Sequence, residues 1–269
     1  MRKAGERTGG KGARMRFEGK CVVITGASSG MGRQIALDFA AEGATVIAVA
    51  RRRERLEELA QAAAASGCAG KVLPYPGDVC SREVNESMID FAVARCGKLD
   101  VLVNNAGVMD EYRPVAEISD EQWFHVMDTN LNGPMYATRK AVQTFLAQRS
   151  AGSIVNVVSI GGVRGCRAGA AYTASKHALI GLTENTAAMY QPKGIRVNAV
   201  CPGGIETEVM KTQKNPSAWG VTRVMTGTDT TIAPGKVGDV SSVVLFAASD
   251  DARYVTGATI VVDGGVSCY

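Results

Sequence analysis

The sequence predicts an α/β fold in which a doubly wound parallel sheet forms the core of a single domain. The chain has 269 residues and is 46% hydrophobic, which is enough for one large core. Short runs rich in Val, Ile and Ala alternate with longer helical patterns along the whole chain. Strands that are apolar throughout and separated by helices are typical of a parallel sheet covered on both faces.

The predicted strands and helices alternate along the chain. We expect strands at residues 21–25, 45–50, 72–75, 99–104, 153–158, 195–200 and 259–262. We expect helices at about 30–42, 53–66, 81–96, 119–149, 170–191 and 239–249. Because crossovers between parallel strands are right-handed, this order gives a doubly wound sheet that binds ligands at the carboxyl ends of its strands.

Two segments lie outside this alternation. Residues 1–15 are rich in Gly, Lys and Arg, so we expect a flexible basic tail before a domain formed by residues 16–269. The sequence leaves open whether Met1 or Met15 is the natural start. Residues 203–236 are rich in Gly, Thr and Pro and follow a strand. Because a long loop at this end of a strand lies beside the ligand site, we expect a substrate lid at about 204–235.

Charge and hydropathy argue against two classes of partner. The net charge is +4, but the excess of basic over acidic residues lies in residues 1–16, and the rest of the chain is slightly acidic. We therefore expect no nucleic-acid partner. No apolar run approaches the roughly 20 residues that span a bilayer, so we expect no membrane partner either.

Cysteine and histidine usage favours a reducing compartment and argues against a metal site. The seven cysteines are scattered and form no CxxC pair: Cys21, Cys68, Cys80, Cys96, Cys166, Cys201 and Cys268. Unpaired thiols of this kind predict a cytoplasmic protein. The only histidines are His125 and His177, too few for a typical metal site, so we expect no metal.

A glycine-rich loop, Thr25–Gly32, joins the first predicted strand to the first predicted helix. Glycines allow the backbone to approach a pyrophosphate, and the amino terminus of the helix adds N–H donors and a positive dipole. Tight turns between strands and helices also use glycine. The strand before this loop and the helix after it favour a nucleotide site.

Tyr172 and Lys176 lie four residues apart on a predicted helix, so their side chains share one face. Free tyrosine has a pKa near 10 and is a poor acid–base group at neutral pH. An ammonium about one turn away favours the phenolate, so we expect Lys176 to lower the pKa of Tyr172. The pair then predicts proton transfer to or from an alcohol or ketone. The same spacing also occurs on solvated helix faces, so this interpretation depends on the other motifs.

Several motifs in this order resemble the short-chain dehydrogenase/reductase family, in its compact single-domain branch, from Phe17 to Gly265. The family's TGxxxGxG loop corresponds to Thr25, Gly26, Gly30 and Gly32. Further matches are Asp78-Val79, Asn104–Gly107 and Pro202-Gly203. The resemblance implies a Rossmann-type fold and the catalytic residues Asn130, Ser159, Tyr172 and Lys176. The cofactor contacts it implies are Gly26, Ser28, Ser29, Gly30, Met31, Gly32, Arg51, Arg52, Asp78, Val79, Asn105, Ala106, Gly107, Tyr172, Lys176, Pro202, Gly203, Ile205 and Thr207.

The residues after the second predicted strand favour NADP(H) over NAD. In NAD-preferring relatives an acidic side chain at the end of this strand binds the ribose 2′-hydroxyl. Here the position is Ala50, followed by Arg51, Arg52 and Arg53. Arginines bind a phosphate well, whereas an acid would repel it. A solvated start of a helix is the other interpretation, but cations there oppose the helix dipole. Some NADP-binding relatives also carry a basic residue where this chain has Ser29.

The resemblance implies hydride transfer between a nicotinamide and a carbonyl carbon. Tyr172 would exchange a proton with the substrate oxygen, and Ser159 would hold that oxygen by a hydrogen bond. Lys176 would bind the nicotinamide ribose, and Asn130 would position a water.

A nucleotide-sensing protein that has lost the chemistry is a distant alternative, because such proteins usually lack part of this set of four catalytic residues. The family commonly forms tetramers, so we also expect a homotetramer built on the helices at about 131–149 and 170–191 and the carboxyl-terminal strand.

The substrate is a small molecule whose class the sequence leaves open. The predicted lid and its surroundings carry large apolar side chains, which suit a bulky hydrophobic substrate or simply anchor the lid: Met109, Met210, Trp219, Val221, Val224 and Met225. Basic residues either form the rim of the entrance and attract an acidic end group or are solvated: Arg164, Arg167, Lys211, Lys214 and Arg223. The leading hypothesis is a hydroxysteroid or bile acid. The alternatives are a 3-oxoacyl group on an acyl carrier protein and a sugar or polyol.

Overall fold

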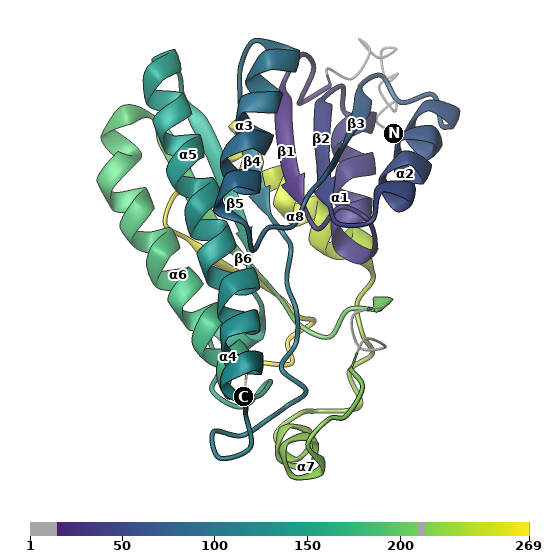
Figure 1. The fold of residues 1–269 in the computed structure, drawn as a ribbon, viewed down its shortest axis with the longest axis vertical. Helices are drawn as coiled ribbons and strands as arrows, with labels where there is room; N and C mark the ends of the chain where they lie inside the picture. The colour runs from purple at the N-terminus through teal and green to yellow at the C-terminus, as the bar shows by residue number, and fades with distance from the viewer. Residues whose placement is uncertain (1–14, 209–212, 269) are drawn as a thin grey trace, which may run out of the picture.

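The computed structural model describes residues 15–208 and 213–268. The predictions made for the tail (residues 1–14), Met210 and Lys211 lie outside these ranges. Seven strands form one parallel sheet in the order β3-β2-β1-β4-β5-β6-β7 (Figure 1). The predicted α/β fold with a doubly wound, Rossmann-type sheet is therefore confirmed. The strands are β1 (Cys21–Thr25), β2 (Thr45–Ala50), β3 (Lys71–Pro76), β4 (Val101–Asn104), β5 (Gly152–Val157), β6 (Ile195–Pro202) and β7 (Thr259–Val262).

The helices cover both faces of the sheet. They are α1 (Gly30–Ala41), α2 (Arg53–Ala65), α3 (Arg82–Cys96), α4 (Asp120–Met127), α5 (Gly133–Gln148), α6 (Ala170–Tyr190), α7 (Ala218–Thr226) and α8 (Val237–Ala248). Alternate strand residues face opposite sides, so Val22 and Ile24 pack with α1, α2 and α8, whereas Val23 packs with α3 and α5. Every residue of β1, β4 and β5 is buried, as a parallel sheet between two helical layers requires.

The predicted helix at 119–149 is not continuous. A five-residue π-helical segment, Asp128–Asn132, separates α4 from α5. Pro134 has no N–H to donate to the carbonyl of Asn130 four residues earlier, so a regular α-helical ladder cannot pass through this point. A Cβ atom on Gly133 would lie 2.6 Å from the carbonyl oxygen of Val79, so only glycine allows this approach. The interruption places Asn130 in the irregular segment, where its side chain is fully buried.

The predicted irregular stretch 203–236 contains the helix α7, whose start is capped by Ser217 accepting a hydrogen bond from Gly220 N at 3.1 Å. An isolated parallel bridge joins Ile205 to Gly235, so the two ends of this stretch lie side by side. Figure 1 shows α7 beyond the carboxyl ends of the strands, away from the sheet. In the described part of the chain, no helix is both long and apolar enough to cross a membrane.

Candidate active site

The Thr25–Gly32 loop has a conformation that its glycines make accessible. Gly26 and Gly30 have φ angles of +68° and +55°, which other residues adopt only with strain. A Cβ atom on Gly26 would also lie 2.8 Å from the Cα of Ala106, and one on Gly32 would collide with the carbonyl oxygen of Gly26. The loop therefore lies directly against the segment after β4 and against the first turn of α1.

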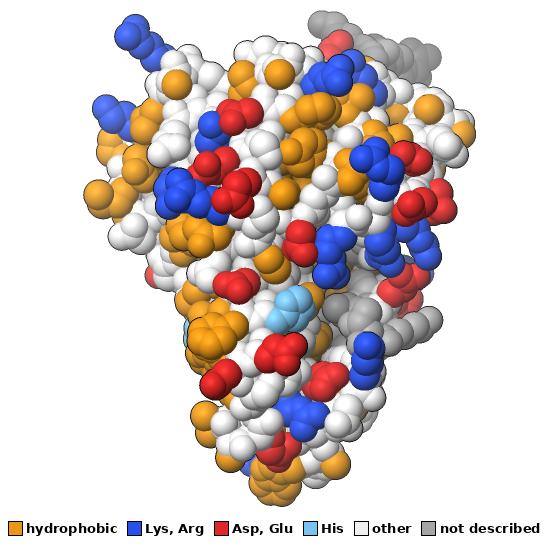
Figure 2. Space-filling view, viewed as in Figure 1, with side chains coloured by type: hydrophobic (Ala, Val, Ile, Leu, Met, Phe, Trp, Pro, Cys, Tyr) orange, Lys and Arg blue, Asp and Glu red, His pale blue; other side chains and the backbone are white. Residues whose placement is uncertain are grey.

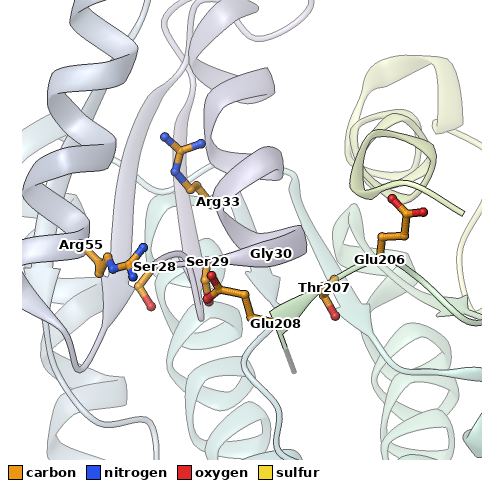
Figure 3. Close-up of a pocket in the computed structure, with 8 residues that line it drawn as sticks. All are labelled: Ser28, Ser29, Gly30, Arg33, Arg55, Glu206, Thr207 and Glu208. Carbon is orange, nitrogen blue, oxygen red and sulfur yellow. The ribbon is translucent and has the colours of Figure 1, made fainter. Parts of the chain in front are cut away.

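The amino terminus of α1 opens onto a pocket of about 450 Å³. Ser29 is the N-cap residue, but its side chain makes no capping hydrogen bond to the helix. The pocket is lined by Ser28, Ser29, Gly30, Arg33, Arg55, Glu206, Thr207 and Glu208 (Figure 3). Uncapped N–H groups, a helix dipole and two arginines are the features that bind a phosphate, so these residues fit the pyrophosphate of a dinucleotide.

Arg52 reaches from the end of β2 to this loop. Its Nη2 donates hydrogen bonds to Ser28 Oγ at 3.0 Å and to Ser29 Oγ at 3.1 Å. Figure 2 shows a group of Lys and Arg side chains near the lower end of α2, on the same edge of the molecule. Some relatives carry a basic residue at the position of Ser29. Here the guanidinium of Arg52, which follows β2, lies beside that position instead. Arg51 is exposed beside Arg52.

Two of the basic residues in the pocket do not belong to the set predicted from the sequence. Arg33 lies on α1 and Arg55 on α2, and both line the pocket with the acidic side chains of Glu206 and Glu208. Neither arginine stands in a recognisable motif. The one signal that could have identified them is their position in the first turn of α1 and of α2, the two helices that follow β1 and β2.

The segment Asn104–Gly107 is fixed to β1 by hydrogen bonds. Thr25 Oγ1 accepts bonds from Asn105 N at 3.0 Å and from Ala106 N at 3.1 Å, and Asn105 Nδ2 donates to Thr25 O at 3.0 Å. Among residues 15–208 and 213–268, Asn105 Oδ1 is buried without a hydrogen-bond partner. A buried acceptor left open beside the glycine loop is consistent with a ligand that approaches this segment.

The other predicted cofactor residues lie at the same end of the sheet. Asp78 is exposed after β3 and accepts a hydrogen bond from Cys80 N, whereas Val79 is buried. Gly203 follows β6 and packs against Asp263, and Ile205 forms the bridge to Gly235. Met31 is partly buried and packs against the core formed by α1, α2 and α8.

The four predicted catalytic residues converge where β4, β5 and α6 meet. Ser159 follows β5, and its hydroxyl accepts a hydrogen bond from Gly161 N at 3.0 Å and forms a further one with the Tyr172 hydroxyl. Lys176 Nζ lies 5.6 Å from the centroid of the Tyr172 ring and donates to Val157 O at 3.1 Å. The side chain of Asn130 holds Val108, accepting from its N at 2.9 Å and donating to its O at 3.0 Å.

Burial decides the protonation of the tyrosine–lysine pair. Desolvation raises the pKa of Tyr172 to about 12, although the hydrogen bond with Ser159 acts in the opposite direction. Desolvation also lowers the pKa of Lys176 to about 8. The expected lowering of the Tyr172 pKa by Lys176 is therefore wrong for this structure, because removal of the phenol from water has the larger effect.

Arg167, in the segment before α6, joins the predicted lid to the domain, and Arg164 in the same segment binds the carboxyl-terminal end of the chain. Arg167 Nη1 donates to Gly227 O at 2.7 Å and to Thr228 Oγ1 at 2.8 Å, and Arg164 Nη2 donates to Ser267 O at 2.8 Å. Both arginines thus donate to backbone carbonyls, and their expected role in attracting an acidic end group stays a prediction. Of the apolar lid residues, Val224 is buried, whereas Trp219 is 62% exposed.

Comparison with known proteins agrees with this geometry. A family model described as "Enoyl-(Acyl carrier protein) reductase" matches residues 26–267. The chain is 41% identical to 3beta-hydroxysteroid dehydrogenase 2 of Eggerthella lenta, over 93% of this chain and 96% of the relative. It is also 41% identical to the 3-oxoacyl-(acyl-carrier-protein) reductase FabG of Thermotoga maritima, over 94% and 99% of the two chains.

Solved structures give the same result. Carveol dehydrogenase from Mycobacterium avium in complex with NAD is similar with a TM-score of 0.84 and 31% identity, covering 94% of this chain and 99% of the other. Levodione reductase is similar with a TM-score of 0.85 and 33% identity, covering 94% and 99% of the two chains. The sheet order, the glycine loop and these similarities together show that the chain belongs to the short-chain dehydrogenase/reductase family, whose members are oxidoreductases that use a nicotinamide cofactor.

Proposed function

We propose that this oxidoreductase is an NADP(H)-dependent hydroxysteroid dehydrogenase that acts on a secondary alcohol or ketone at the 3β position of a steroid or bile acid. The observation that carries the proposal is the similarity to steroid enzymes combined with a complete set of acid–base residues. A 3beta-hydroxysteroid dehydrogenase of Mediterraneibacter gnavus is 37% identical over 94% of this chain, in addition to the Eggerthella lenta enzyme. Tyr172, Ser159 and Lys176 stand together as proton transfer at an alcohol oxygen requires.

The chain's own residues supply proton transfer and substrate orientation. The nicotinamide, when bound, accepts or donates the hydride. Tyr172 gives a proton to the oxygen of the ketone during reduction and takes it from the alcohol during oxidation. Ser159, hydrogen-bonded with Tyr172, holds the same oxygen where negative charge develops. Lys176 places a positive charge beside the phenol. Asn130 fixes the loop after β4 through Val108.

The preference for NADP(H) is supported by the arginines at the glycine loop. Arg52 already lies within hydrogen-bond distance of Ser28 and Ser29, so it is placed to bind a phosphate on the adenosine ribose. Arg51 and Arg55 add positive charge on the same side of the molecule. Carveol dehydrogenase, a relative of this fold, is in complex with NAD, so measurement of both cofactors tests the preference.

A second candidate function is 3-oxoacyl-(acyl-carrier-protein) reduction. It is favoured by the Thermotoga maritima relative, whose 41% identity equals that of the Eggerthella lenta steroid enzyme. Both reactions use the same acid–base residues and differ in the substrate that residues 204–235 accept.

The test is turnover with purified protein. NADP⁺ and NAD⁺ reduction are measured with a panel of 3α-, 3β-, 7- and 17-hydroxysteroids and bile acids, beside NADPH oxidation with a 3-oxoacyl thioester. We expect 3β-selective turnover with NADP⁺, and loss of at least about 10²-fold in kcat for Tyr172→Phe, because the phenol is the only acid–base group assigned to the substrate oxygen. Turnover of the thioester alone would reject the steroid proposal. Wild-type turnover by Tyr172→Phe would reject the assignment of the site.

We also propose a homotetramer. Phe124 on α4 and Met189 on α6 are 61% and 66% exposed, and Phe246 on α8 and Val261 on β7 are 40% and 43% exposed. These residues lie on elements close to those through which the family commonly pairs. Light scattering coupled to size exclusion measures the mass directly, and a monomer would contradict this proposal.

A further inference from the structure

Asp110 is a fully buried carboxylate with no part in the chemistry described so far. It lies in the loop after β4, three residues beyond Gly107, and none of its surface is exposed. A carboxylate is costly to bury unless hydrogen bonds compensate for the lost water. The position of its partners therefore indicates what it does.

The carboxylate of Asp110 accepts hydrogen bonds from three backbone N–H groups, two of which belong to Tyr172 and the nearby Gly169. Oδ2 accepts a hydrogen bond from Tyr172 N at 2.8 Å. Oδ1 accepts from Gly169 N at 3.0 Å and from Tyr112 N at 3.2 Å. Because α6 starts at Ala170 and its N-cap Gly169 has no side chain, Asp110 caps this helix from a different loop. One of its bonds goes to the main chain of the acid–base residue itself.

The loop that carries Asp110 is shaped to fit the start of α6. A Cβ atom on Gly169 would lie 2.5 Å from Arg113 N and 2.6 Å from Asp110 Oδ2. Arg113 O accepts a further hydrogen bond from Ala170 N at 2.8 Å. Glu111 has a φ angle of 56°, as has Tyr112, a conformation that costs a residue with a side chain on the order of 1–2 kcal/mol. The contacts with α6 compensate for this strain.

We propose that Asp110 is a positioning residue for the reaction: its carboxylate fixes the first turn of α6 and so holds the Tyr172 hydroxyl against Ser159. The proposal rests on the proposed role of Tyr172 as proton donor and acceptor. Because Tyr172 lies in the first turn of α6, a shift of this turn also displaces the Tyr172 hydroxyl. A displacement of about 1 Å at a reacting group costs roughly 10²-fold in rate.

The charge of Asp110 also acts on the phenol, which gives the proposal a second readout. The titratable groups around the Tyr172 ring are Asp110, Tyr112, Cys201 and Lys176. The first three raise the pKa of Tyr172, whereas the Ser159 hydrogen bond lowers it. Removal of the Asp110 charge should therefore make Tyr172 titrate at lower pH. A residue needed only for stability would not move this titration.

Two variants separate position from charge. Asp110→Asn keeps the size of the side chain but has one acceptor oxygen for three N–H groups, and it has no charge. Asp110→Glu keeps the charge but places it one methylene further out. Tyrosinate absorbance is followed against pH as the difference between each protein and its Tyr172→Phe counterpart, together with kcat on a 3β-hydroxysteroid and the Kd of NADPH.

We expect Asp110→Asn to lose roughly 10- to 100-fold in kcat, to keep its Kd for NADPH and to titrate Tyr172 at lower pH. Asp110→Glu should also lose kcat but titrate Tyr172 close to the wild-type pH. The matched control is Asp100→Asn, which removes another backbone-capping carboxylate, bonded to Cys21 N at 2.8 Å at the opposite end of β1. This control should leave both readouts unchanged.

Three results would overturn the proposal: wild-type kcat in Asp110→Asn, loss of kcat with an unmoved Tyr172 titration, or parallel loss of kcat and NADPH affinity. The titration requires no substrate, so failure of the steroid panel would reject the proposed function and leave the titration and NADPH-binding readouts to test this proposal. If neither variant folds, amide exchange in the wild-type protein decides the matter. Slow exchange of the Gly169 and Tyr172 amides supports the cap, and exchange as fast as at the start of α2, which has no side-chain cap, contradicts it.

Discussion

Arg52 provides a sharp test of cofactor selection, because its guanidinium already contacts the glycine loop. Nη2 lies 3.0 Å from Ser28 Oγ and 3.1 Å from Ser29 Oγ, so the group is held in place before any ligand binds. A hydrogen bond between an arginine and a phosphate contributes about 1.5–3 kcal/mol. This free energy corresponds to a preference of about ten- to 150-fold. A cofactor without the phosphate gains none of it.

The assay compares kcat/KM for NADPH and NADH with one substrate. In Arg52→Ala we expect the NADPH/NADH ratio to fall by about ten- to 150-fold, with little change in the value for NADH. Arg53→Ala is the matched control, because the adjacent Arg53 has a side chain that is 64% exposed and lies 4.0 Å from Glu57 on the surface of α2. An unchanged ratio in Arg52→Ala would refute the reasoning. An equal fall in both variants would mean that general positive charge, not a contact, selects the cofactor.

Two further predictions follow from the packing and protonation of the site. Gly133→Ala should destabilise the protein by about 1–3 kcal/mol in urea denaturation and lower kcat, because its Cβ would meet the Val79 carbonyl and displace Asn130. The control Gly238→Ala, which has open space at the Cβ position on α8, should be neutral or stabilising. At neutral pH a Tyr172 pKa of about 12 and a Lys176 pKa of about 8 leave the phenol protonated and the ammonium charged. Ketone reduction should decline as pH rises above about 8, because Lys176 loses the positive charge beside the phenol there. Alcohol oxidation needs the phenolate of Tyr172 and should increase with pH. Identical pH profiles in the two directions would contradict this assignment.

The strands were predictable because each is an apolar run whose composition does not depend on its neighbours. Even β3, with Pro74 and Pro76, obeys a local rule, since it lies at the edge of the sheet, where a missing N–H is tolerated. The break before α5 was not predicted, although the pair Gly133-Pro134 is a signal for it. The pocket residues Arg33 and Arg55 were missed for a different reason. Exposed arginines on helices are common, and only the packing of α1 beside α2 brings these two to one pocket.

The acid–base pair shows most clearly what spacing in the sequence can and cannot give. Four residues on a helix do bring Lys176 close to Tyr172, with 5.6 Å between Nζ and the ring centroid. Whether this lowers the pKa of the tyrosine depends on how much water remains around both groups, and that is set by segments distant in the sequence. Asp110 comes from the loop after β4 and Ser159 from the end of β5, and both act on the phenol. The helix thus places the pair, and burial by the segments around it sets the pH at which each member loses its proton.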